Sequence, residues 1–375
     1  MKILKYFYLV ILILLVSTPI YSQCLQEEID KTEYIWKKDA DALTDRPGPA
    51  NLPKEQAIVK KIADIAEGFY PRPKGGEIEW YGYYSGQLIQ GQYSKGYQLD
   101  ILFSRYQCTN GKVKLIAYNS SIYVAVNALT FFGNEFDMNG KTWTTVHAAF
   151  HAVDGYTYFN FNRNDRYNTE ESWLITYNGK LPFSLVSRKE YVTEARADQM
   201  KAKDKKAAEL KKSYGIKSQA EQDAARQRYV EGLKKSYKGD ELTKRIEKYD
   251  LEKKADQGRY EEAVKFNDEH YKKIIGKYDE FLASHDEAYM SQPAIVKPYT
   301  REVFDGFDNN IDEVNSVYLV KNNPSYYNSG LPVTAPQYIT VLARHPKKGD
   351  TDAMFYDGIA KKEFLDSLAA LLGKQ

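Results

Sequence analysis

Residues 98–118, with the sequence QLDILFSRYQCTNGKVKLIAY, carry the pattern that decides the fold. On both sides of the centre, apolar and polar side chains largely alternate, which is typical of a β-strand with one buried face. Asn110-Gly111 joins the two halves. Asn-Gly fills two-residue hairpin turns because both central positions need a positive φ. The stretch therefore predicts an antiparallel β-hairpin.

The same turn signal recurs three times between residues 77 and 186. Asn139-Gly140, Asp154-Gly155 and Asn178-Gly179 each separate two short segments that read as strands. Strands joined by such short turns can only pair antiparallel. We therefore expect an antiparallel meander, and together with the helices described below an α+β fold.

Two helices are expected before this sheet, at residues 27–40 and 53–68. The second begins with Pro53, and proline suits the first turn of a helix because the N–H group it lacks has no partner there. The sequence YPRPKGGE at 70–77 then ends the helix. These helices and the sheet form the first predicted unit, residues 23–186.

The composition changes at residue 187 to lysine, glutamate, alanine and tyrosine. Three helices are expected, near 188–213, 219–237 and 240–284, within a helical insertion that spans 187–290. The last helix repeats apolar residues in steps of three and four, which is typical of a short coiled-coil-like seam. An interaction arm and a helical hairpin packed on the body both fit this pattern. The seam residues are Tyr260, Val264, Tyr271, Ile274, Tyr278 and Phe281, with Asn267 the one polar interruption.

The last segment, residues 291–375, contains two predicted strands, 315–320 and 337–343, and one predicted amphipathic helix near its end. So few elements bury little apolar surface by themselves. We therefore expect this segment to pack back on the sheet of residues 23–186.

The N-terminus has the pattern of a signal peptide. Residues 1–22 contain two lysines, an apolar run and small residues before the expected cleavage after Ser22. The protein is then exported, to the periplasm or the extracellular space. A surface form with a lipid on Cys24 is the alternative, although Gln23 fits a lipoprotein signal poorly. No later apolar run is long enough to span a bilayer.

Cysteine usage fits an oxidising compartment. The chain has two cysteines, Cys24 and Cys108. A disulfide between them would join the mature N-terminus to the sheet, and two unpaired thiols are the alternative.

The charge balance excludes one class of partner. Without residues 1–22 the chain has 51 basic and 51 acidic residues. A nucleic-acid binder would show a basic excess or a basic stripe, so we expect no nucleic-acid partner.

Two segments have partial metal-binding patterns. His147, His151 and Asp154 would share one face of a helix, but the Asp154-Gly155 turn places them on a strand. There the two histidines lie about 13 Å apart and cannot share a metal ion. The sequence DGFDNNIDE at 305–313 matches the first three ligand positions of a calcium loop but lacks its glycine and its final glutamate. Calcium is thus a weak candidate cofactor, and its ligands would be Asp308, Asn310 and Asp312.

Tyrosine is abundant, with 32 residues in the chain. Its ring suits both half-exposed strands and surfaces that bind sugars or proteins. Two dense clusters in the predicted strands make an aromatic ligand platform the main candidate binding site. Its residues are Trp80, Tyr81, Tyr83, Tyr84, Tyr156 and Tyr158.

Recognisable catalytic motifs are absent from the sequence. It contains no nucleophile elbow and no phosphate-binding glycine loop, whereas paired carboxylates of a glycosidase would leave no local signature.

Four segments resemble uncharacterised secreted proteins of Bacteroidota: FYPRPKGGEIEWY, VNALTFF, SRKEYV and NPSYYNSGLPVTAPQYITV. The resemblance covers most of the mature chain. It implies an exported or envelope protein and no particular activity.

These observations favour an exported, non-catalytic binding or interaction protein of the cell envelope, with a protein or glycan ligand. The helical region would mediate protein contacts. The alternative is an extracytoplasmic hydrolase, for example one acting on a glycan, that uses paired carboxylates. A calcium-stabilised adhesion protein is the third and weakest hypothesis. Two close carboxylates with aromatic walls would favour the hydrolase, whereas an aromatic surface without such a pair would favour binding.

Overall fold

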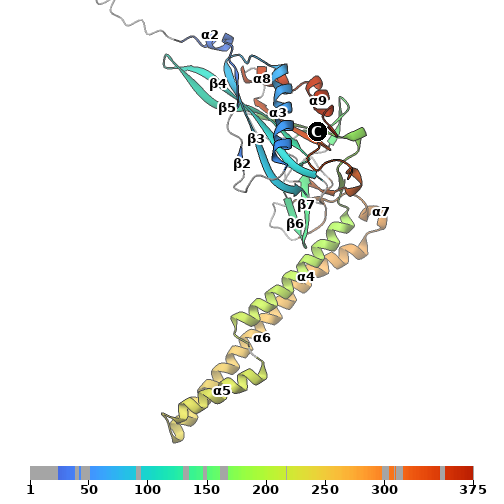
Figure 1. Ribbon diagram of the computed structural model, residues 1–375. Helices are drawn as coiled ribbons and strands as arrows, with labels where there is room; N and C mark the ends of the chain where they lie inside the picture. Colours follow the sequence, from blue (N-terminus) through green and yellow to red (C-terminus); the bar gives the residue numbers. More distant parts are fainter. Residues whose placement is uncertain are drawn as a thin grey trace, which may run out of the picture.

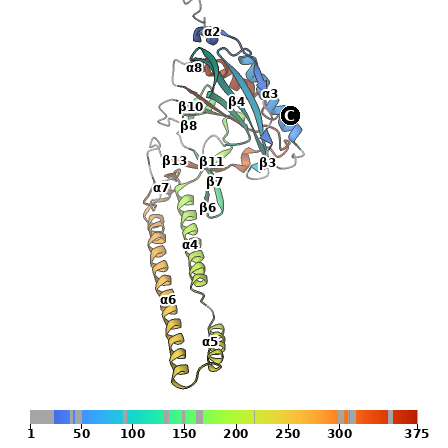
Figure 2. The same cartoon turned by 90° about the vertical axis from the view of Figure 1, so that its left-hand side faces the viewer.

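The computed structural model describes residues 24–38, 42–43, 51–89, 94–129, 135–146, 150–160, 168–216, 218–297, 304–307, 309, 316–346 and 351–374. They form a body of two β-sheets and several helices, from which a long helical arm projects (Figures 1 and 2). The expected α+β class with antiparallel sheets and a long helix is confirmed.

The larger sheet has nine described strands, eight of them in the order β1-β3-β4-β5-β14-β10-β9-β8, with β2 beside β3. All its pairings are antiparallel except those of β1 and β2 with β3. The strands are β1 (Trp36–Lys38), β2 (Ala42–Leu43), β3 (Gly76–Ile89), β4 (Ser94–Thr109), β5 (Lys112–Val126), β8 (Phe150–Val153), β9 (Tyr156–Asn160), β10 (Asn168–Ile175) and β14 (Ile339–Pro346).

Three of the four expected turns join hairpins. Asn110 and Gly111 have φ values of 52° and 72°, and the pairs at 139–140 and 154–155 are also positive at both positions. The fourth prediction is wrong. Gly179 has a positive φ, but it ends a short 3-10 helix, η1 (Tyr177–Gly179). The strands on its two sides belong to different sheets because β10 pairs with β9 and β14, whereas β11 pairs with β13.

A second sheet was not expected from the sequence. It has the order β11-β13-β7-β6, with β12 paired to β13. An apolar cluster joins the two sheets, since Phe159 and Leu174 of the larger sheet pack with Val146 and Val320 of the smaller one. The strands are β6 (Glu135–Met138), β7 (Lys141–Val146), β11 (Phe183–Leu185), β12 (Ile295–Val296) and β13 (Val317–Asn322).

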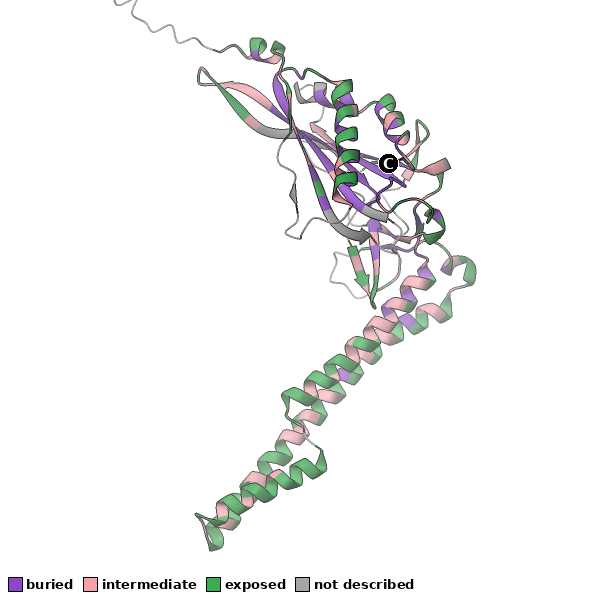
Figure 3. Cartoon of the chain, viewed as in Figure 1, coloured by how far each residue is buried: buried purple, intermediate pink, exposed green. Residues whose placement is uncertain are grey.

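Helices cover the other face of the larger sheet. They are α3 (Leu52–Phe69), α8 (Thr351–Ile359) and α9 (Lys362–Ala369). The main core lies between these helices and strands β3, β4, β5, β10 and β14, as the buried residues in Figure 3 show. The helix expected at 27–40 is shorter than predicted, because α2 (Gln26–Lys31) is followed by strand β1. Helix α8 was not predicted.

The C-terminal segment contributes a central strand, because β14 lies between β5 and β10. A buried asparagine at the end of β5 fixes the approach of this segment. Asn127 Nδ2 donates a hydrogen bond to the carbonyl of Ala335 (3.0 Å), and its Oδ1 accepts one from the N–H of Gln337 (2.7 Å).

The arm consists of α4 (Arg188–Ser213), α5 (Gln219–Lys234) and α6 (Gly239–Ser284), and the one-turn helix α7 (Glu287–Met290) follows at its base. Ser187 and Ser218 cap α4 and α5, because each side chain accepts a hydrogen bond from the backbone N–H three residues later. Helix α6 has 46 residues and is therefore about 70 Å long. None of the described helices is long and apolar enough to cross a membrane.

Candidate functional site

The arm is braced against the body at its root. Lys141, in the β6–β7 hairpin, forms an ion pair with Glu194 of α4 at 2.6 Å. Asn139, in the turn of the same hairpin, donates from its side chain to Glu194 (2.6 Å) and from its backbone N–H to Asp198 (3.1 Å). Lys321 of β13 pairs with Glu190. These contacts connect the first turns of α4 to the second sheet and set the direction of the arm.

Arg188, the first residue of α4, is buried at the same root. Its guanidinium lies over the ring of Tyr289 (4.1 Å) and near that of Phe307 (5.5 Å), and it donates a hydrogen bond to Asn309 Oδ1 at 2.6 Å. A buried arginine held by aromatic faces and an amide fixes the helix start through packing as well as charge.

Helices α4 and α6 pack side by side, and three of the predicted seam residues, Ile274, Tyr278 and Phe281, belong to an apolar cluster with residues of α4. Near the body, Val192 and Ala195 of α4 pack against Tyr278 of α6. Ion pairs flank the seam, including Arg196–Asp279 and Lys203–Asp268. Asn267 is 5% exposed, and its Nδ2 has no hydrogen-bond partner among the described residues.

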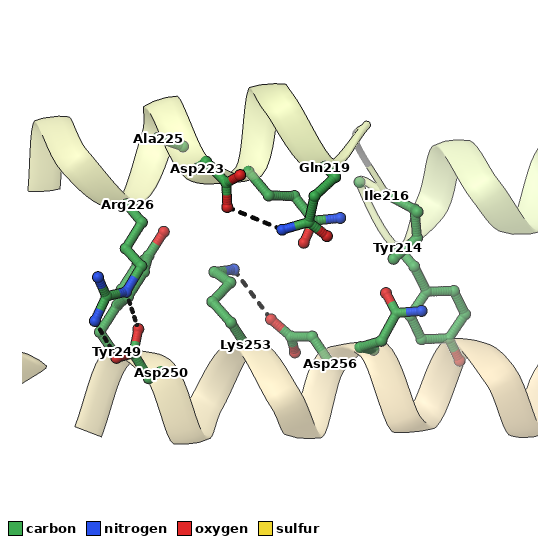
Figure 4. A pocket seen from close by; sticks show the side chains of 13 residues that line it. Tyr214, Ile216, Gln219, Asp223, Ala225, Arg226, Tyr249, Asp250, Lys253 and Asp256 are labelled. Carbon is green, nitrogen blue, oxygen red and sulfur yellow. Dashed lines mark hydrogen bonds and ion pairs between the residues drawn. The ribbon is translucent and has the colours of Figure 1, made fainter. Parts of the chain in front are cut away.

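Farther out, α5 and α6 enclose a cleft of about 400 Å³ (Figure 4). Helix α5 has no buried residue, so this pair of helices lacks an apolar seam. The cleft is lined by Tyr214, Gly215, Ile216, Gln219, Gln222, Asp223, Ala225, Arg226, Tyr249, Asp250, Lys253, Asp256 and Gln257.

Charged side chains organise the cleft. Arg226 of α5 reaches across to Asp250 of α6 through two hydrogen bonds, of 2.6 and 2.7 Å, and closes one end. On α6, Lys253 pairs with Asp256 at 3.1 Å. The hydrogen bonds from Arg226 lower the pKa of Asp250, and that from Lys253 lowers the pKa of Asp256. Both carboxyl groups therefore stay ionised, which suits binding rather than general acid catalysis.

The aromatic residues predicted as one platform do not form one surface. Trp80 and Tyr84 are buried in the core against the helices. Tyr81 and Tyr83 alternate with them on β3, so they lie on the opposite face, where their rings are 5.1 Å apart. Four strands, β4, β5, β14 and β10, separate β3 from β9, which carries the remaining two predicted tyrosines, 156 and 158.

On the face that carries Tyr81, a carboxyl group is buried. Asp100 of β4 pairs in register with Tyr81, is 4% exposed, and accepts a hydrogen bond from Gln98. Burial raises the pKa of Asp100 to about 6, although that hydrogen bond opposes the shift. Glu79 of β3 pairs with Leu102 and is thus the diagonal neighbour of Asp100, with Cβ atoms about 7–8 Å apart.

At the far end of the sheet, the predicted Tyr158 belongs to a cluster that local sequence patterns do not reveal. Glu171 of β10 accepts hydrogen bonds from Tyr158 of β9 (2.8 Å) and from Tyr356 of α8. His345 of β14 stacks on the ring of Tyr356, and its Nε2 lies 3.7 Å from Glu171. This distance is too long for a hydrogen bond, so the attraction is electrostatic. The neighbouring Tyr156 donates to Asp366 of α9 at 2.6 Å.

The cluster shifts the pKa values of its members. Burial alone would lower the pKa of His345, but Glu171, the backbone carbonyl of Pro346 and Asp357 together outweigh burial and raise it. Burial alone would raise the pKa of Glu171, but His345 and the two tyrosine hydroxyls outweigh burial and lower it. Burial and Glu171 raise the pKa of both tyrosines. The four groups therefore favour a His⁺–carboxylate pair between β14 and β10, and Tyr356 connects α8 to this pair.

The histidine hairpin has the expected register, with Val153 opposite Tyr156 and His151 opposite Tyr158. His147 lies outside the described residues, as do the candidate calcium ligands Asp308, Asn310 and Asp312. The described ranges contain no group of three or more histidine, cysteine or acidic side chains placed to hold a metal ion.

Cys24 and Cys108 form a disulfide. It ties the chain before α2 to the end of β4, and the side chain of Gln26 reinforces the contact by accepting a hydrogen bond from the N–H of Cys108 (2.8 Å). A thioether-linked lipid would use the same sulfur of Cys24, so the disulfide form and a lipid-anchored form exclude each other. In Figures 1 and 2, helix α2 lies at the end of the body opposite the arm.

Comparison of the chain with protein-family models, with curated proteins and with solved structures finds no match.

Proposed function

We propose that this chain is an exported, non-catalytic binding or interaction protein of the cell envelope, and that the helical arm is its contact surface. The observation that carries the proposal is the exposure of the arm over a helix of 46 residues, of which two are buried. A long helical pair that exposes most of its surface is suited to contact a partner at a distance from the body. Export itself rests on the sequence of residues 1–22.

The arm also exposes large apolar side chains. On α6, Leu251 is 70% exposed and Phe266 is 73% exposed. The ion pairs and the buried Arg188 at the root hold the arm in a fixed direction, so a partner would meet a preorganised surface and lose less conformational entropy on binding.

Site-specific photocrosslinking in the native host tests this proposal. A photoreactive amino acid at position 251 or 266 should give discrete adducts, whose bound component mass spectrometry can classify as protein or glycan. Positions 113 and 115 on the β4–β5 hairpin are the matched controls, because Val113 and Leu115 are also exposed apolar residues, at 51% and 45%. Adducts at the control positions and none on α6 would contradict the proposal.

A hydrolase is the second candidate, and Asp100 favours it. A carboxyl group with a pKa of about 6 can be protonated near neutral pH, as the acid of a glycosidase must be. Glu79 would supply the second carboxylate, and Tyr81 an aromatic wall. Under this hypothesis the protein cleaves a glycoside, and Asp100→Asn lowers the rate by about 100-fold or more. A panel of fluorogenic glycosides measures this, with Asp64→Asn on the surface of α3 as the control. If no glycoside is cleaved, this candidate is rejected.

A further inference from the structure

The cleft between α5 and α6 has the chemistry of a ligand site. Gln219 and Asp223 of α5 face Lys253 and Asp256 of α6 across the gap (Figure 4). Because α5 has no buried residue, no apolar seam fills the space between the two helices here. The volume of about 400 Å³ lies within the range of small-molecule sites, about 300–1,000 Å³.

The charge of the lining excludes two kinds of ligand. Residues 188–284 contain 25 basic and 20 acidic residues, yet the cleft has three aspartates against two cations, Arg226 and Lys253. An anionic ligand would therefore meet a net negative lining within a basic arm. A largely apolar ligand finds few partners, because Ile216 and Ala225 are the only aliphatic side chains among the described residues of the lining.

A neutral ligand rich in hydroxyl groups fits the polar side chains of this lining. Such a ligand needs carboxylate and amide groups that accept and donate several hydrogen bonds, and Asp223 and Gln219 offer them beyond the 2.9 Å bond that joins them. It also needs a flat ring to cover its C–H surface, which Tyr249 and Tyr214 can provide from the two ends of the cleft. Tyr249 is held in place by stacking on Tyr229, with ring centroids 4.2 Å apart.

We propose that this cleft binds a neutral carbohydrate of one or two sugar rings. The inference rests on the proposed function, because it assigns the arm a ligand class. A peptide is the less favoured ligand, since peptide-binding grooves on helices present apolar pockets for side chains, and the cleft has none of that kind.

Saturation-transfer NMR on the full chain tests the assignment with a panel of maltose, cellobiose, lactose and N,N′-diacetylchitobiose. At least one of these neutral disaccharides should show transfer, and the acidic disaccharide of hyaluronan should show none. No transfer to any neutral disaccharide, or stronger transfer to the acidic one, would overturn the inference. The photocrosslinking result is independent of this panel, so the arm could fail here and still be a protein-binding surface.

Matched variants locate the binding. Asp223→Ala removes a carboxylate that accepts a hydrogen bond from a glutamine one turn earlier, and Glu231→Ala removes an equivalent group outside the cleft. Affinity should fall about tenfold or more in the first, equivalent to about 1.4 kcal/mol, and stay unchanged in the second. Tyr249→Ala should weaken binding and Tyr249→Phe should restore it. Equal affinity in all four variants would place the sugar elsewhere and refute the cleft.

Discussion

The body and the arm are stabilised in different ways. In the body, α3 alone buries six side chains, and residues such as Ile62 and Phe364 are fully buried. In the arm, α5 buries none, and α6 buries two of its 46 residues. Helix caps, exposed ion pairs and one narrow seam replace a core there. The difference indicates that the body folds by apolar burial, and that the arm depends on local helix signals and on its attachment to the body.

Removal of β14 should be the most damaging change. A chain that ends at residue 338 loses a strand between β5 and β10, together with α8 and α9, which cover the core. The burial lost includes Phe364, Leu365 and Leu368, each worth about 1.5–3 kcal/mol against a total stability of about 5–15. The truncated chain should aggregate or unfold without a cooperative transition in thermal circular dichroism.

The matching deletion in the arm provides the contrast. Replacement of residues 190–284 by a short flexible linker should leave a cooperative melt, because the two ends of the arm lie together at its root, where Lys189 of α4 pairs with Glu287 of α7 (2.7 Å). If this protein also fails to melt cooperatively, the arm is required for the body to fold and the contrast is wrong.

Two phenylalanines test the same contrast within the intact chain. Phe364 is fully buried under the sheet, whereas Phe266 is 73% exposed on α6. Phe364→Ala should cost about 3–5 kcal/mol, because it leaves a cavity. Phe266→Ala should change stability by less than about 0.5 kcal/mol. Urea unfolding measures both, and a large loss for Phe266→Ala would show that the arm is covered in solution.

Features encoded over short distances could be predicted from the sequence. The turns at Asn110-Gly111 and Asp154-Gly155 depend on two adjacent residues. The helix starts at Ser187 and Ser218 depend on four consecutive residues, from the capping serine to the N–H that it binds. The failure at Asn178-Gly179 has the same origin. Here Gly179 has a positive φ in a short 3-10 helix, and the strands on the two sides pair in different sheets, because two adjacent residues do not specify long-range strand pairing.

The candidate sites depend on distant residues and had no local signal. Glu171 and Tyr356 are 185 positions apart, and Arg226 and Asp250 are on separate helices. The aromatic platform failed as a single surface because alternation along β3 sends neighbouring residues to opposite faces. That rule was readable in the sequence, and it would have separated Trp80 and Tyr84 from Tyr81 and Tyr83.

A substitution at Asn267 should have a smaller effect on stability, and this effect should be confined to the arm. Within the part of the chain that the structure describes, the buried Nδ2 of Asn267 has no hydrogen-bond partner, and an unsatisfied buried polar group costs about 1–3 kcal/mol. Asn267→Leu should therefore stabilise the α4–α6 pair and slow amide hydrogen exchange there, with little change in the body. Phe266→Leu, one position away and exposed, is the control and should change neither. Faster exchange in Asn267→Leu would mean that the asparagine fixes the register of the seam, as polar residues do in coiled coils.

The smallest expected effect is the change in the stability of the body with pH. The raised pKa of His345 gives stability that is complete below about 6.5, its unfolded value, and is lost as pH rises through the folded value. The lowered pKa of Glu171 gives stability that is present above about 4.3 and is lost as pH falls through the folded value. The pair therefore contributes most between about pH 4.3 and 6.5. Because both groups are partly exposed, solvent screening keeps the contribution small.

Melting temperatures of the wild type and of His345→Gln across this range isolate the effect. The difference between the two proteins should be largest near pH 5.5, a few degrees at most, and should shrink toward pH 8 as His345 loses its proton. When both proteins also carry Tyr356→Phe, the difference between their melting temperatures should be smaller. This substitution removes a hydrogen bond to Glu171 and leaves the stacked ring in place. The arm offers an internal reference, since its hydrogen exchange should not follow this profile. A constant difference from pH 5 to pH 8 would mean that His345 acts in the body only through packing, with no contribution from its charge.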